Sequence, residues 1–199
     1  MRKSIFSALA VGLMLGAVAL ASGVRYVSVD QTPLYGSEEA DTELTALRVT
    51  SEVEVLEEGD AHSLVKITGF IRAEAESDVV FTNTVDEIEI TTAVDASLLT
   101  QLAAAEGFAE VELTGYVANE ALVEDREEMF TTAAGVYQRY CSRCHVGYAG
   151  PVEQLIERLR PREWPSFARR MAVGTGISDS DLNLIIHWLQ TESQAARAE

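Results

Sequence analysis

Cysteine and histidine are scarce in this chain, which has two cysteines and three histidines among its 199 residues. So few cysteines exclude a disulfide-rich secreted scaffold, in which several bridges supplement a small core. Basic residues are also few: 15 Lys and Arg stand against 32 Asp and Glu, for a formal net charge of −17 at pH 7. This balance argues against nucleic-acid binding, because phosphates are contacted mainly by Lys and Arg.

Long hydrophobic runs are lacking except near the N-terminus, where Arg2 and Lys3 precede an uncharged run over residues 5–21. A basic start, an apolar middle and the small-residue ending ALA are typical of a secretory signal peptide, here residues 1–21. The alternative is a retained inner-membrane anchor, for which the run lies at the short limit of length. In either case we expect the rest of the chain in the periplasm.

Residues 22–120 alternate apolar and polar side chains and are rich in β-branched types, which is typical of half-buried strands. Two segments repeat: VKITGFI begins at Val65 and VELTGYV at Val111, so Gly69 and Gly115 lie 46 residues apart. The stretch TPLYGSEEADTELTALRVTSEVEVLEEGDAHSLVKITGFI resembles a bacterial SH3-like domain. We therefore predict an α+β fold that begins with an SH3-like antiparallel β region, best explained as two small barrels. A single β-sandwich is the alternative.

Residues 121–199 change to a helical pattern, with good helix formers and few breakers. The predicted helices cover residues 120–141, 151–160, 165–172 and 181–194. Asp179 or Ser180 is expected to cap the last helix, in which Leu182, Ile185 and Leu189 share one face. We predict a small all-helical domain, and a domain of that size needs a staple, a metal or a cofactor to supplement its core.

Both cysteines lie in the sequence Cys141-Ser142-Arg143-Cys144-His145, a C-x-x-C-H motif of the kind that attaches c-type haem. Two thiols on one helical turn can reach the two vinyl groups of a porphyrin, and the histidine that follows can bind the iron. We therefore predict one covalent haem c on Cys141 and Cys144, with His145 as a metal ligand. The alternatives are a redox-active C-x-x-C pair, half of a zinc site, and coincidence. No second Cys/His pair has zinc-ligand spacing.

A second metal ligand is predicted at Met171, which lies 26 residues after His145 and just before the last helix. A thioether is a common axial ligand of cytochrome c iron. His187, within the last helix, is the alternative. Three neighbours are expected to support the pocket. Gly135 and Tyr137 are expected to allow a close crossing of the first and last helices, and Trp164 is expected to shield a porphyrin edge.

Charge is distributed unevenly along the chain. Residues 22–136 contain 25 acidic and five basic side chains, whereas residues 137–176 contain seven arginines and three glutamates. We expect arginines near the motif, especially Arg143, Arg169 and Arg170, to steer an acidic redox partner toward it.

With these residues assembled, the segment GVYQRYCSRCH…P…EWPSFARRMAVGTGISDSDLNLIIHWLQ resembles the C-terminal monohaem region of the pentahaem c-type cytochrome of the trimethylamine N-oxide reductase system. The resemblance implies an SH3-like region followed by an all-helical, class I-like cytochrome c domain, with boundaries at residues 22–120 and 121–199. It implies that Cys141 and Cys144 carry the haem, that His145 is the proximal ligand and that Met171 is the second. This chain has no further C-x-x-C-H motif, so it would need a separate electron donor.

The sequence thus predicts an exported monohaem cytochrome c, an electron carrier rather than an enzyme, acting in anaerobic respiration. The expected partners are redox proteins: a multihaem quinol oxidase as donor and a molybdenum reductase as acceptor. Contact with a membrane is expected only if the N-terminal segment is retained. The alternative is a haem-bearing sensory or docking module whose SH3-like region binds a partner.

Overall fold

The computed structural model describes residues 23–145 and 151–198. The predicted signal peptide, residues 1–21, lies outside the described residues. Within the described part of the chain, no helix combines the length and the apolar character needed to cross a bilayer.

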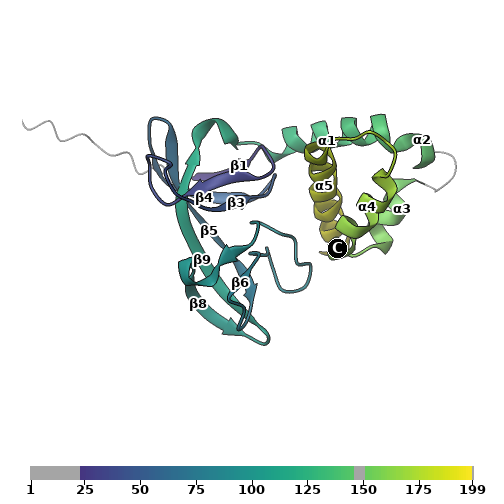
Figure 1. Cartoon of the computed structure of the whole chain (residues 1–199). Coiled ribbons are helices and arrows are strands. Elements are labelled where there is room, and N and C mark those ends of the chain that lie inside the picture. Colours follow the sequence, from purple (N-terminus) through teal and green to yellow (C-terminus); the bar gives the residue numbers. More distant parts are fainter. Residues whose placement is uncertain (1–22, 146–150, 199) are drawn as a thin grey trace, which may run out of the picture.

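Most strands form one antiparallel sheet that curls into a half-barrel (Figure 1). Its strands are β1 (Gly23–Val27), β2 (Thr32–Tyr35), β3 (Glu43–Leu47), β4 (Glu52–Glu58), β5 (His62–Arg72), β8 (Thr100–Ala105), β9 (Phe108–Ala118) and β10 (Leu122–Val123). The order is β10–β1–β4–β5–β9–β2–β3, and β8 also pairs with β9. Two short strands, β6 (Ser77–Asp78) and β7 (Val94–Asp95), make a second sheet, and η1 (Ala96–Leu98) and η2 (Asn119–Ala121) are 3-10 turns.

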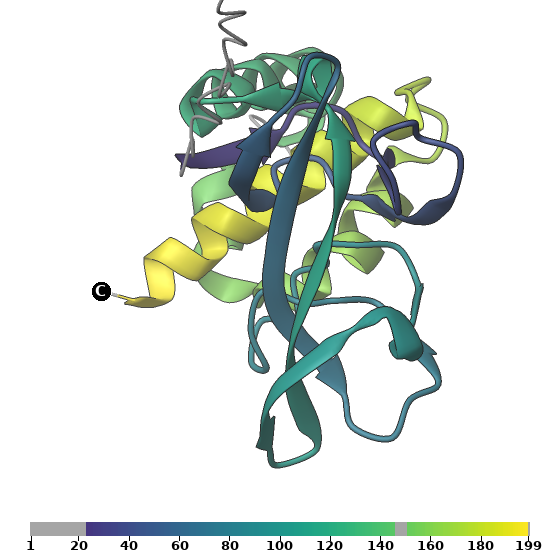
Figure 2. The same ribbon diagram turned by 90° about the vertical axis from the view of Figure 1, so that its left-hand side faces the viewer.

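The two long strands β5 and β9 run side by side through the sheet (Figure 2). They pair along their whole length, with Ile67 opposite Leu113. Alternate side chains of both strands are buried, as the period of two requires. These strands contain the two repeated segments, so the copies of the repeat are direct partners in one sheet.

The 46-residue repeat extends well beyond these two strands. In the first copy the β4–β5 pairing shifts register between Val55 and Glu57. In the second copy the β8–β9 pairing shifts register between Gln101 and Ala103, and each of these residues lies 46 positions after its counterpart in the first copy. The copies also exchange pairings: Tyr35 of the first pairs with Tyr116 of the second, and Phe81 of the second with Phe70 of the first. Each half therefore completes the sheet of the other.

The prediction of two small barrels is therefore wrong. One buried cluster runs through both copies and includes Val65 and Ile67 together with Val111 and Leu113. Alternation along a strand determines which side chains face a core, but it does not determine which strand is the neighbour. Because the two repeated strands pair with each other, no boundary separates two cores.

The helices follow the sheet in the sequence and lie beside it in space (Figure 1). They are α1 (Arg126–Tyr140), α2 (Ser142–His145), α3 (Val152–Arg158), the 3-10 turn η3 (Pro161–Glu163), α4 (Trp164–Ala172) and α5 (Asp179–Ala198). Asp125 caps α1 by accepting a hydrogen bond from the Glu127 amide. At α5 the capping side chain is Ser178, whose hydroxyl accepts from the Asp181 amide, rather than Asp179 or Ser180.

The expectation of a separate, all-helical class I-like cytochrome c domain is also wrong, because α5 packs in two directions. Its Ile185 and Leu189 join Tyr137 and Trp164 in the core between the helices. Its other side reaches the sheet, where Asn183 donates a hydrogen bond of 2.6 Å to Asp30. Helical periodicity predicted the first of these faces and carried no information about the second. The division at residue 120 stays a prediction, although β10 continues the sheet beyond it.

The expectation that Gly135 allows a close helix crossing is wrong as well. Gly135 is exposed on α1, and a Cβ built there meets nothing within 4 Å. The glycines that do permit a close approach are those of the repeat. A Cβ at Gly69 would lie 2.5 Å from the carbonyl oxygen of Phe81, and one at Gly115 would lie 2.7 Å from that of Tyr35.

Gly115→Ala is therefore expected to destabilise the protein, whereas Gly135→Ala is expected to stabilise it. At Gly115 the obstacle is backbone, and overpacking of this kind costs about 1–3 kcal/mol. At Gly135 the space is open, and alanine gains about 0.5–1 kcal/mol over glycine in a helix. Urea denaturation of the two variants measures the difference, and shifts of the same sign would contradict the close approach of β2 to β9.

Candidate functional site

All four predicted site residues line one apolar pocket between the helices: Cys141, Cys144, His145 and Met171. The pocket encloses about 80 Å³. Its wall is completed by side chains from every helix of this part of the chain, namely Tyr137, Tyr140, Val152, Leu155, Trp164, Phe167, Ala168, Ala172, Thr175, Ile177, Leu182, Ile185 and Leu189. The structure therefore brings together residues that are up to 30 positions apart in the sequence.

The end of α1 and the short helix α2 hold the motif in one turn. The Cys141 amide donates to the carbonyl of Tyr137 at 2.8 Å, and the His145 amide donates to that of Cys141 at 3.3 Å. Cys141 is half-buried, Cys144 is exposed, and His145 is 6% exposed. The two thiols and the imidazole thus line the same pocket from one short stretch of five residues.

Three buried polar atoms of the pocket lining have no hydrogen-bond partner among the described residues. They are the Tyr137 hydroxyl, Nδ1 of His145 and Nε1 of Trp164. Leaving such a group buried and unpaired costs about 1–3 kcal/mol each. Their concentration in one otherwise apolar pocket indicates a site whose occupant supplies polar partners.

Burial raises the pKa of the Cys141 thiol, and the neighbouring Cys144 raises it further. Burial also raises the pKa of the Tyr137 hydroxyl, with smaller contributions from Cys141 and Glu153. A redox-active C-x-x-C pair requires the opposite, a thiol whose pKa is lowered so that the thiolate can attack. The surroundings of Cys141 therefore disfavour the thioredoxin-like alternative.

The protein ligands of an ordinary zinc site do not converge here. Among residues 23–145 and 151–198, no three His, Cys, Asp or Glu side chains are grouped so that they could hold a metal ion. A structural zinc site needs four such ligands. A haem iron differs, because the macrocycle supplies four ligands and the protein adds only one or two.

Met171 reaches the pocket from the apolar side of α4. Trp164, Phe167 and Ala168 of the same helix also line the pocket, with Trp164 2% exposed and packed edge-on against Phe167. Met171 is 40% exposed at the pocket mouth. Beyond α4 the chain turns through Gly174, whose φ of +81° favours glycine.

His187 points away from the pocket, toward the sheet. It lines the two cavities between α5 and the sheet and is 7% exposed. A half-turn of α5 separates it from Ile185 and Leu189, which face the apolar pocket. His187 could bind a metal in that pocket only if α5 rotated and gave up its packing on both sides.

The arginines expected at a docking surface differ in their surroundings. Arg169 turns toward the sheet and donates to Oδ1 of Asn183 at 3.0 Å. Arg170 is exposed beside Arg162 and Ser166. Steering of an acidic partner by these side chains stays a prediction.

No known protein family, curated protein or solved structure matches this chain, so the function of the pocket has to be argued from its own residues.

Sequence reasoning placed the motif but missed most of the pocket wall. Leu155, Ile177 and Leu182 come from separate segments and form no spaced motif. Helical periodicity marked Leu155 and Leu182 only as apolar positions, and Ile177 lies outside the predicted helices. The unpartnered hydroxyl of Tyr137 had no signal in the sequence at all.

The stability of the protein should depend on pH through His187. Burial lowers the pKa of this histidine from 6.5 to about 4; Asp30 opposes the shift, and Arg48 and Arg169 add to it. Between these two values the unfolded chain binds a proton that the folded protein does not. The free energy of unfolding should therefore fall as the pH falls from 6.5 to 4, by as much as about 3 kcal/mol from this group.

Urea denaturation of the parent and of His187→Gln at pH 7.5, 6, 5 and 4 measures this contribution. The difference between the two proteins at pH 7.5 reports packing alone, since both side chains are neutral there. That difference should shrink as the pH falls, because only the parent loses stability through this titration. A difference that is constant with pH would contradict the assignment.

Proposed function

We propose that this protein is an exported monohaem c-type cytochrome that carries single electrons between redox proteins. The observation that carries the proposal is the coincidence of a C-x-x-C-H motif with three unpartnered buried polar atoms in one apolar pocket. The motif supplies the two attachment points and a metal ligand. The unpartnered atoms match an occupant that is apolar over most of its surface and polar at a few points.

In this proposal Cys141 and Cys144 would hold the haem through thioethers, and His145 and Met171 would bind its iron. The haem, when bound, supplies reversible one-electron chemistry at its iron. The hydroxyl of Tyr137 and the Nε1–H of Trp164 are donors, and they suit the carboxylate groups at the edge of a haem.

The pocket reaches the surface at Cys144 and Met171, whose side chains are both exposed.

The remaining wall would keep water away from the centre. Leu155, Trp164, Ile185 and Leu189 present apolar surface to the pocket. A low-dielectric surrounding disfavours a net charge and so helps to set the redox potential of a buried centre. Exposed Cys144 marks the opposite side, where an edge of the haem would remain accessible to a partner.

The partners stay predictions: a quinol-linked multihaem donor and a terminal reductase of the trimethylamine N-oxide reductase type. They rest on the resemblance in residues 135–190. The part of that resemblance which concerned the fold is wrong, so the pairing needs direct measurement of electron transfer with each candidate partner.

Covalent attachment is the first test. Protein exported from cells with a haem-ligation system should keep its colour after denaturation and acid extraction, because thioethers survive both. The Cys141→Ala, Cys144→Ala double variant should lose the colour on extraction. Colourless parent protein with two free or disulfide-bonded thiols would overturn the proposal.

The second metal ligand gives a separate test. Met171→Ala should abolish the weak sulfur-to-iron charge-transfer band of the ferric protein and lower its redox potential, because a thioether favours ferrous iron. His187→Gln is the matched control and should leave both nearly unchanged, since His187 lies on the sheet side of α5. If the parent lacks the band, or if only the histidine variant changes coordination, the assignment of Met171 is wrong. An open coordination position would favour the sensory alternative over electron transfer.

A further inference from the structure

A second cavity, of about 350 Å³, lies between the sheet and the helices. Its walls come from the turn after β3, the end of β5, the segment around Phe81, and helices α4 and α5. It lies on the side of α4 opposite the apolar pocket, because Ser166 and Arg169 face it whereas Phe167 and Met171 face the pocket.

Four arginines line this cavity, in a chain with a net charge of −17: Arg48, Arg72, Arg162 and Arg169. Only two carboxylates line it with them, Glu87 and Glu89. The remaining charged neighbours, Asp30 and Asp78, lie behind Arg48 and Arg72 and do not line the cavity.

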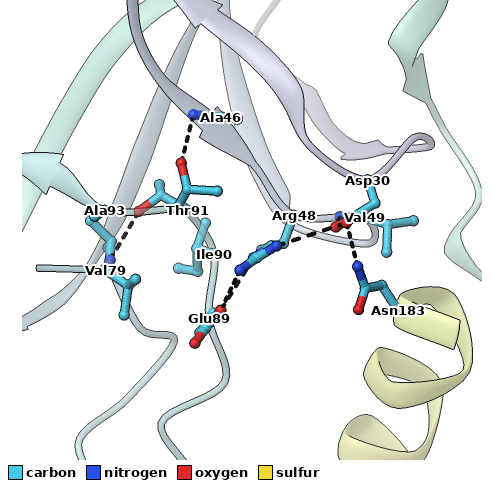
Figure 3. Close-up of polar contacts among 12 residues, drawn as sticks. Asp30, Ala46, Arg48, Val49, Val79, Glu89, Ile90, Thr91, Ala93 and Asn183 are labelled. Carbon is cyan, nitrogen blue, oxygen red and sulfur yellow. Dashed lines mark hydrogen bonds and ion pairs between the residues drawn. The ribbon is translucent and has the colours of Figure 1, made fainter. Parts of the chain in front are cut away.

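The arginines are incompletely paired. Arg48 bonds to Oε2 of Glu89 at 2.9 Å, with Asp30 at 3.8 Å on its other side (Figure 3). Arg72 bonds to Glu87 at 2.6 Å and to Asp78 at 3.1 Å, and Glu87 also lies 3.7 Å from Arg162. A guanidinium carries more N–H donors than these contacts use, so donors remain for another partner.

Arg169 has no carboxylate partner at all among the described residues. Its one side-chain hydrogen bond goes to the amide oxygen of Asn183. Asn183 in turn donates to Asp30, which Figure 3 shows between α5 and Arg48. A guanidinium so placed is available for a bidentate contact with an oxyanion.

A mostly buried histidine, His187, also lines the cavity. It is 7% exposed, and the hydrogen bond that it accepts from the Thr191 hydroxyl is made by its backbone carbonyl and not by its ring. Its lowered pKa keeps the ring neutral near pH 7, so it offers one N–H donor without adding charge. Pro165 and Ser166, in the first turn of α4, add the positive end of a helix dipole to the same wall.

We propose that this cavity binds a small multivalent oxyanion, with Arg169 as its principal ligand and Arg48, Arg72 and His187 as further donors. The cavity is large enough for a molecule with two oxyanion groups, which would bridge the sheet and α4. Phosphate and carboxylate groups share the geometry that a guanidinium recognises. The proposal is independent of the haem site, because no residue of the apolar pocket takes part.

Isothermal titration calorimetry of the full chain with pyrophosphate and with citrate, at low ionic strength, tests the site. The two probes distinguish a site for phosphate groups from a site for carboxylate groups. The parent should bind at least one of them with a stoichiometry of one. Arg169→Gln should weaken binding about tenfold or more, the loss expected for a hydrogen bond to a charged group. Arg158→Gln is the matched control: it removes the same charge from an exposed position on α3 outside the cavity, and it should change the affinity less than twofold.

Two results would overturn the proposal. The first is that neither probe binds at millimolar concentration, in which case the arginines serve only as ion pairs between the sheet and the helices. Equal weakening by Arg169→Gln and Arg158→Gln would show that the anion responds to overall charge and not to this cavity. A thermal melt of each variant without the probe confirms that the comparison is made on folded protein.

Discussion

The packing of α5 on both of its sides is the constraint on which the rest of the structure depends. Ile185 and Leu189 close the core of the helical part, while Asn183 and His187 face the sheet. A helix that is buried on opposite sides cannot rotate to satisfy one side without exposing the other. This fixes the orientation of the apolar pocket relative to the sheet, and it fixes which histidine can reach the pocket.

The two interfaces of α5 differ in chemistry. The side toward α1, α3 and α4 is apolar, with aromatic contacts such as that between Tyr137 and Trp188. The side toward the sheet is polar: Asn183 and Gln194 donate side-chain hydrogen bonds to Asp30 and Asp86, and two cavities lie there. Polar interfaces between parts of one chain are typical of surfaces that bind ligands or adjust their contacts. The proposed haem site and the proposed anion site therefore lie on opposite sides of the same helical layer.

The candidate site was predictable from the sequence where its residues are close together in the chain. Cys141, Cys144 and His145 form a local motif, and local spacing on a helix is a property of the sequence. Met171 needed an argument from placement in a family, yet the structure brings it to the same pocket. The cavity lined by Arg169 and His187 had no signal in the sequence, because its walls come from segments of the sheet and of the helices that lie far apart in the chain.

The sequence by itself determined the strands, the helices and the 46-residue repeat, because alternation, helical periodicity and repetition are local properties. Only the tertiary structure decided that β5 and β9 pair with each other, so that one half-barrel replaces two barrels. It also decided that α5 joins the helices to the sheet instead of closing a separate domain. Both decisions depend on which buried surfaces meet, and a pattern of apolar residues shows that a surface will be buried without showing against what.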